Sequence, residues 1–171
     1  KNAFVYVKDG LDSGYSFDVP TAAVVLDQQG CKYTPHVAGV RVGQPIDIVN
    51  SDETLHNIHA LPMSNREFNR GQKLKGEKYQ TVFTVPEVMV PFKCDVHRWM
   101  NAWVGVVAHP FYAVSGAGGA FELKGLPPGT YTIEFKNTGA IAHDITPDGG
   151  ETHTAQAGET VTFDVAVPSA G

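Results

Sequence analysis

The sequence has little positive charge, few charged residues of either sign and no long apolar run. Of its 171 residues, 13 are Lys or Arg and 18 are Asp or Glu, and the formal net charge is −5. Without a basic run, the chain lacks the charge pattern of a nucleic-acid-binding protein. It also lacks the roughly 20 consecutive apolar residues that a membrane-spanning helix needs. We therefore expect neither a nucleic-acid partner nor a transmembrane segment in this sequence.

Helix signals are also scarce, whereas turn residues are frequent. The 18 Gly and 11 Pro are spread along the chain without a period, which favours many short strands joined by turns. The polar stretch 62–76 shows no periodicity and is predicted to be a long loop. The fold class predicted from these features is all-β. Alternating or β-branched runs predict strands over residues 2–8, 22–26, 45–49, 79–85, 88–93 and 102–107.

The composition changes after His109-Pro110, where Gly-rich turns and short strands follow. The stretch from Gly119 to Ile133 contains Leu-Pro-Pro-Gly-Thr-Tyr-Thr-Ile and resembles the hairpin of carboxypeptidase-regulatory-like β-sandwich modules. That resemblance implies a fold and no particular chemistry. We therefore predict two domains, residues 1–110 and a smaller β-sandwich module over 111–171.

Only two cysteines, Cys31 and Cys94, are present. They are compatible with one disulfide in an oxidising compartment, or with one structural thiol and one metal ligand. The chain begins at Lys1 rather than Met, which we interpret as the removal of a leader or lipid-bearing segment, or as an artificial boundary of the sequence. Anchoring to a membrane through such a segment stays open.

The segment from Cys94 to Met100 favours the metal-ligand alternative for Cys94. It places a thiolate, the His97 imidazole and a thioether at intervals of three residues, and these are the donors that copper prefers. A second imidazole must come from elsewhere, and His56 is the best candidate. His59 is three residues away on the same predicted strand, so it points to the other face and is expected beside the metal rather than on it.

These residues resemble those of the cupredoxins over residues 1–110. The pair His56-Asn57 and the Cys94-x-x-His97 spacing resemble plastocyanin, whereas the His97-x-x-Met100 spacing resembles the copper domain of cytochrome oxidase subunit II. The resemblance implies a Greek-key β-sandwich that binds copper through His56, Cys94, His97 and Met100. Position 98 is Arg, so the second loop cysteine of a dinuclear site is missing, and one copper per chain is expected.

The resemblance further implies a carrier of single electrons, not an enzyme, that works in the periplasm or outside the cell. Its partners would be redox proteins, including a membrane electron-transfer complex. Two other functions are also compatible with the sequence. One is a copper carrier or sensor, and the other is a metal-free structural subunit with a Cys31–Cys94 disulfide. After residue 110 the chain has no cysteine or methionine, only His143 and His153, so no second copper site is expected there. The pair Asp52-Glu53 is interpreted as a turn.

Overall fold

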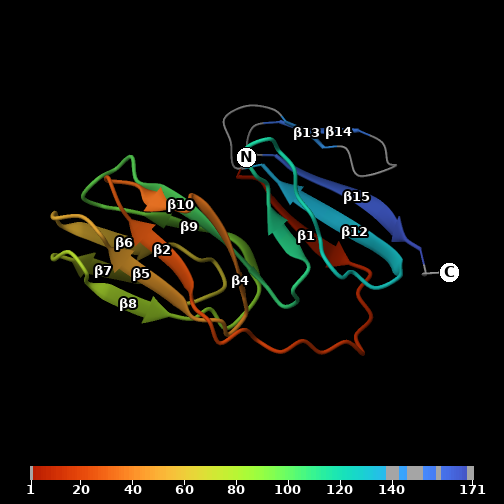
Figure 1. The fold of residues 1–171 in the computed structure, drawn as a ribbon, viewed down its shortest axis with the longest axis horizontal. Helices are drawn as coiled ribbons and strands as arrows, with labels where there is room; N and C mark the ends of the chain where they lie inside the picture. The colour runs from red at the N-terminus through yellow and green to blue at the C-terminus, as the bar shows by residue number, and fades with distance from the viewer. Residues whose placement is uncertain (1, 138–142, 146–151, 157–158, 169–171) are drawn as a thin grey trace. The chain divides into compact units, whose positions relative to one another are not determined.

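The computed structural model describes residues 2–137, 143–145, 152–156 and 159–168, and within these ranges the chain forms strands and loops (Figure 1). The all-β prediction is therefore confirmed. No helix among the described residues has the length and hydrophobicity needed to cross a bilayer. The chain divides into two compact units, Asp18–Pro110 and a unit that combines Lys1–Phe17 with Phe111–Gly171.

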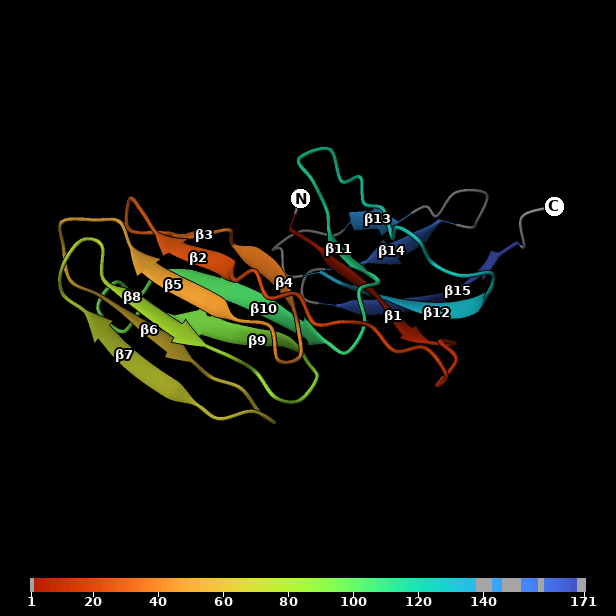
Figure 2. The same cartoon turned by 60° about the horizontal axis from the view of Figure 1, so that its bottom comes forward.

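The unit Asp18–Pro110 is a β-sandwich of two sheets. Its strands are β2 (Val24–Gln28), β3 (Tyr33–Thr34), β4 (Val37–Arg41), β5 (Ile46–Asn50), β6 (His56–Ala60), β7 (Phe68–Gln72), β8 (Lys78–Thr81), β9 (Glu87–Lys93) and β10 (Asn101–Val107). One sheet has the order β3-β2-β5-β8 and the other β4-β10-β9-β6-β7 (Figure 2). The pairs β2 with β5 and β4 with β10 are parallel, and the remaining pairs in both sheets are antiparallel.

A single hydrophobic cluster joins the two sheets of this unit. Ile46 and Ile48 contribute from β5, and Val104 and Val106 from β10. In each pair the residues are two apart, so they point to the same face of their strand. All four are at most 1% exposed, and full burial of one such side chain contributes roughly 1.5–3 kcal/mol to folding. The alternating runs of the sequence thus become the inner faces of the sandwich.

The predicted long loop over 62–76 contains one strand that the sequence did not indicate. Strand β7 pairs antiparallel with β6 along its whole length. Its residues are mostly polar and exposed, because β7 lies at the edge of the five-stranded sheet. Hydrophobic alternation could not reveal a strand of this kind, since its hydrogen bonds to β6 define it.

The second unit has its own sheet and its own hydrophobic cluster. Its strands are β1 (Phe4–Asp9), β11 (Tyr112–Val114), β12 (Gly129–Lys136), β13 (His143–Ile145), β14 (His153–Ala155) and β15 (Thr160–Val167). They form a four-stranded sheet in the order β11-β1-β12-β15 and a two-stranded sheet of β13 with β14.

The grouping of the first residues differs from the predicted domain 1–110. Strand β1 lies between β11 and β12 and pairs with both, so residues 1–17 belong with 111–171. Val5 and Val7 of β1 are buried in that unit's hydrophobic cluster. A strand pattern shows that a segment needs neighbours, but it does not show which sheet provides them. The two units meet along the chain at Phe17–Asp18 and at Pro110–Phe111.

Candidate metal centre

Two segments about forty residues apart meet at the end of the five-stranded sheet. His56 is the first residue of β6, and the loop from Cys94 to Met100 connects β9 to β10. Strands β6 and β9 run antiparallel, with His59 opposite Lys93. The start of β6 therefore lies beside the residues that follow the end of β9. Ligands from these two segments can contribute to one metal site only if the segments lie this close together.

The side chains of His56, Cys94 and His97 converge there. The Nδ1 atoms of the two imidazoles are 3.0 Å apart, and the Cys94 Sγ lies 3.8 Å from the His97 Nδ1. Donor atoms that share one ion at bond lengths of about 2.0–2.3 Å are expected about 3–4 Å apart. The two separations from His97, and the chemistry of the three donors, fit a single copper ion.

Hydrogen bonds within the loop fix its shape. The Cys94 N–H donates to the Met100 carbonyl at 3.2 Å, and the Met100 N–H donates to the His97 carbonyl at 2.9 Å. The His97 N–H in turn points at the Cys94 sulfur, at 3.3 Å. Cys94 and Met100 are each 1% exposed and belong to the same hydrophobic cluster. The loop thus presents its two sulfur-bearing residues on the core side and His97 nearer to solvent.

Asn57 fastens this loop to β6. Its Oδ1 accepts a hydrogen bond from the Asp95 N–H at 2.5 Å, and its Nδ2 donates to Asn69 Oδ1 at 2.6 Å. The Tyr33 hydroxyl donates to the Asn57 carbonyl at 2.6 Å. The residue that follows His56 therefore ties the positions of the two predicted histidine ligands together.

His59 lies beside the site, and carboxylates engage both of its ring nitrogens. Its Nδ1 is 2.9 Å from Asp95 Oδ2, and its Nε2 is 3.0 Å from Glu67 Oε1. Hydrogen bonds from Lys93, Asn69 and His59 lower the pKa of Asp95, so this carboxylate stays ionised. The arrangement leaves His59 as a link between acidic side chains.

Asp52, which the sequence indicated only as a turn residue, orients His56. Its Oδ2 is 2.8 Å from the His56 Nε2 and accepts the Cys31 N–H at 2.9 Å, and its Oδ1 accepts the Gly30 N–H at 2.8 Å. The pKa of Asp52 is lowered to about 2 by the bond from the Cys31 N–H, then by those from His56 and Gly30. A carboxylate at Nε2 places the ring proton there and leaves the Nδ1 lone pair for a metal.

Replacing Asp52 by asparagine is expected to weaken copper binding about 10–100-fold, the usual effect of losing such a partner of a metal-bound histidine. Competition with a chelator measures this change. The lowered pKa means that ionised Asp52 stabilises the fold above about pH 4, and that this contribution disappears as the pH falls toward 2. The variant should therefore lose part of the acid dependence of metal-free unfolding.

The neighbouring Glu53→Gln variant is the matched control for Asp52→Asn. The Glu53 side chain is 81% exposed and pairs only with Lys75 among the ion pairs of the described residues. It should leave both the copper affinity and the acid unfolding profile unchanged. Equal copper affinities in the two variants would contradict the orienting role of Asp52.

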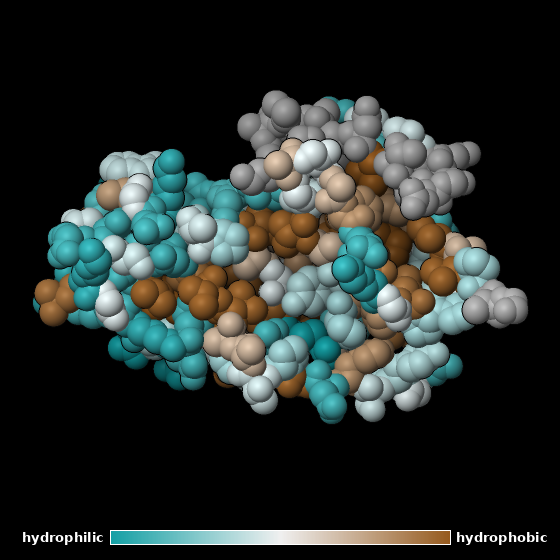
Figure 3. Space-filling view, in the orientation of Figure 1, coloured by the Kyte–Doolittle hydropathy of each residue, from teal (hydrophilic) through white to brown (hydrophobic). Residues whose placement is uncertain are grey.

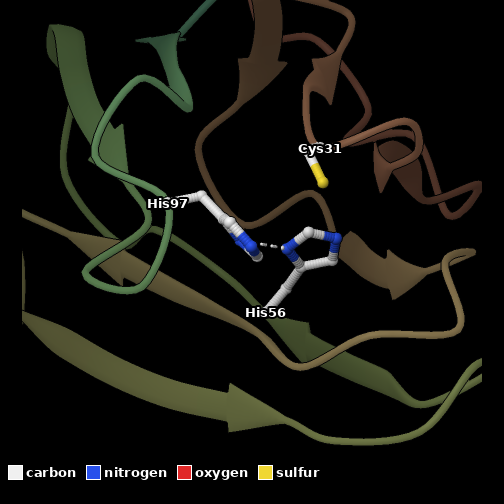
Figure 4. Close-up of side chains that lie close together, drawn as sticks. All are labelled: Cys31, His56 and His97. Carbon is white, nitrogen blue, oxygen red and sulfur yellow. Dashed lines mark hydrogen bonds between the residues drawn. The ribbon is translucent and has the colours of Figure 1, made fainter.

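Cys31 is the second residue that the sequence analysis did not assign to the site. Its Sγ and one ring nitrogen each of His56 and His97 lie within 4.8 Å of one another (Figure 4). Both Cys31 and Cys94 are free thiols in the structure, so the alternative with a Cys31–Cys94 disulfide is not what the structure contains. Cys31 lies in the turn between β2 and β3, in the other sheet. No sequence motif around it indicated a role in a metal site.

No protein-family model matches the sequence, and no curated protein sequence matches it significantly. Solved structures similar to the chain include a copper-containing nitrite reductase from Thermus scotoductus SA-01, with 23% identity, a TM-score of 0.46, and coverage of 57% of this chain and 25% of that one. An oxidised variant of amicyanin has 21% identity, a TM-score of 0.45 and coverage of 60% and 97%. A purple cupredoxin from Nitrosopumilus maritimus has 20% identity, a TM-score of 0.42 and coverage of 48% and 98%. All three TM-scores are below 0.5, so the proposals below rest on the residues of this chain.

Proposed function

We propose that the unit Asp18–Pro110 is a cupredoxin-type copper domain that carries single electrons between redox proteins outside the cytoplasm. The observation that carries the proposal is that the His97 Nδ1 lies 3.0 Å from the His56 Nδ1 and 3.8 Å from the Cys94 Sγ. Two imidazoles and one thiolate form the donor set of electron-transfer copper sites, and a weak thioether completes it. Met100, buried beside Cys94, is the proposed thioether.

The residues of the chain hold this donor set in place from several sides. Asp52 fixes the ring of His56, Asn57 ties β6 to the Cys94 loop, and the loop closes on itself through backbone hydrogen bonds. Copper bound there supplies a one-electron couple between its cuprous and cupric states. A rigid surrounding of this kind restricts ligand movement when the charge of the ion changes, which favours fast electron transfer.

His97 is the proposed ligand through which electrons pass between the copper centre and a redox partner. His56 is completely buried, whereas His97 is half-buried. Next to His97, Val96 is 49% and Trp99 65% exposed. On the face seen in Figure 3, hydrophilic residues cover much of the surface and hydrophobic ones form smaller groups. We place the docking of a redox partner at the edge formed by His97 and its neighbours.

The test is to add one equivalent of Cu(II) to purified protein and record the optical and EPR spectra, followed by the reduction potential. An intense visible thiolate-to-copper band and reversible one-electron cycling are expected. Protein that stays colourless with copper bound would refute the proposal. The copper-carrier alternative has the same ligands, and rapid loss of copper to a chelator would favour it over electron transfer.

Replacing Met100 by leucine tests the fourth donor. Loss of an axial sulfur removes a donor that favours the cupric state, so the potential should rise while copper stays bound. A rise of about 60 mV corresponds to a tenfold change in the relative affinities for the two copper states, and a change of that order is expected. Voltammetry of the wild type and the variant measures it. An unchanged potential and spectrum would mean that Met100 only fills the core.

A further inference from the structure

The Cys31 thiol stands at the metal centre although the four proposed ligands do not include it. Its Sγ forms one cluster with ring nitrogens of His56 and His97, in which all three atoms are within 4.8 Å of one another (Figure 4). A sulfur and a nitrogen on the same ion are at most about 4.4 Å apart, given bond lengths of about 2.3 and 2.1 Å. The 4.8 Å upper bound on the distances within the cluster exceeds this value by about 0.4 Å. A small rotation of a side chain, or a long axial bond to the metal, accounts for a difference of that size.

Hydrogen bonds from two loops hold Cys31 next to both histidines. Its N–H donates to Asp52 Oδ2 at 2.9 Å, the oxygen that also lies 2.8 Å from the His56 Nε2. Its carbonyl accepts the indole N–H of Trp99 at 3.1 Å, and the Trp99 ring lies 5.3 Å from the ring of His97. The backbone of Cys31 is thus connected to one histidine through a carboxylate and to the loop of the other through an indole.

We propose that the Cys31 thiolate is a further ligand of the copper ion, so that two thiolates and two imidazoles surround the metal together with the Met100 thioether. This inference rests on the proposed function. Cys94 is 1% exposed whereas Cys31 is only partly buried, so the first sulfur is supplied from the core and the second from the more accessible side. Thiolates are soft donors that select Cu(I), and a second one strengthens the hold on the cuprous ion.

Alkylation of the reduced full-length protein tests the proposal without a substitution. N-ethylmaleimide is added with and without one equivalent of Cu(I), and mass spectrometry measures the labelling of each cysteine. In metal-free protein Cys31 should react, because it is partly exposed. With Cu(I) its labelling should slow by about tenfold or more, since a metal-bound thiolate is no longer a free nucleophile. Equal rates with and without Cu(I) would overturn the proposal.

Cys31→Ser and Cys31→Ala separate ligation from simple shielding of the thiol. Competition with bicinchoninate should show Cu(I) affinity about tenfold or more below that of the wild type, because a soft donor is lost. The visible spectrum of the cupric form should shift while the band from Cys94 persists. Glu53→Gln, at an exposed side chain that is no proposed ligand, is the control, and the protection of Cys31 by Cu(I) should persist in it.

The outcomes distinguish this inference from the proposed function. If the wild type takes up no copper, both fail. If the wild type shows a Cys94-dependent band, and both Cys31 variants keep its spectrum and its Cu(I) affinity, only the role of Cys31 is overturned. Protection of Cys31 without any loss of affinity in the variants would also overturn it, because shielding alone explains that result.

Discussion

Replacing Cys94 by serine is expected to lower about tenfold or more the intense visible band that the bond between the buried Cys94 thiolate and Cu(II) produces, so that any thiolate band that remains comes from Cys31. The Cys94 Sγ is 3.8 Å from the His97 Nδ1 and accepts the His97 N–H, and the other sulfur of the loop, in Met100, belongs to a weaker thioether donor. A serine hydroxyl is close in size but is a poor ligand for copper. Absorption spectra at equal copper content measure the change.

The control for Cys94→Ser is the unfolding transition of the metal-free protein. Cys94 belongs to the hydrophobic cluster, and a buried hydroxyl costs roughly 1–3 kcal/mol, so some loss of stability is expected. The spectrum is therefore compared at a temperature where both proteins are folded. A variant that folds, binds copper and keeps the full band would show that Cys94 is not the ligand.

The His56→Ala variant is expected to lose the visible band and most of its copper affinity, whereas His59→Ala should keep both. His56 presents its Nδ1 at 3.0 Å from that of His97, while Asp95 and Glu67 lie at the two ring nitrogens of His59. Removal of one imidazole leaves a site with too few strong donors for Cu(II). Copper titration of the two variants, each followed by its spectrum, compares them directly.

The paired design makes His59→Ala a control for the general effect of removing a histidine from β6. It should reduce stability only modestly, since it removes hydrogen bonds at the rim to partly exposed carboxylates. Loss of the band in His59→Ala together with its retention in His56→Ala would reverse the assignment of the second imidazole.

The all-β fold could be predicted because its main strands bury one face and alternate in sequence. Ile46 and Ile48, or Val104 and Val106, show this pattern directly. Strand β7 could not be found in the same way, because it lies at a sheet edge and its side chains are mostly polar. The strands that pair with β1 could not be predicted either, because the alternation of residues within a strand contains no information about the sheet to which that strand belongs.

In the candidate site too, local sequence spacing predicted some residues, and only the three-dimensional structure shows the others. Cys94, His97 and Met100 lie within seven consecutive residues, so their spacing alone suggested a common purpose. Cys31 comes to the site through the turn between β2 and β3 of the other sheet, and Asp52 through the connection from β5 to β6, which joins the two sheets. Their roles depend on a hydrogen bond between the Cys31 N–H and the Asp52 carboxylate, a contact across 21 residues that no periodicity encodes.

The placement of β1 makes the unit Asp18–Pro110 an insertion within the chain of the second unit. The chain completes one strand of the second unit, leaves it after Phe17, forms the whole unit Asp18–Pro110 and returns at Phe111. The rings of Phe17 and Phe111 are in edge-to-face contact at 5.3 Å, so the points of departure and return are neighbours. A short linker in place of residues 18–110 is therefore expected to span the junction. A protease cut at Phe17 would leave the unit Asp18–Pro110 covalently joined to the second unit through Phe111.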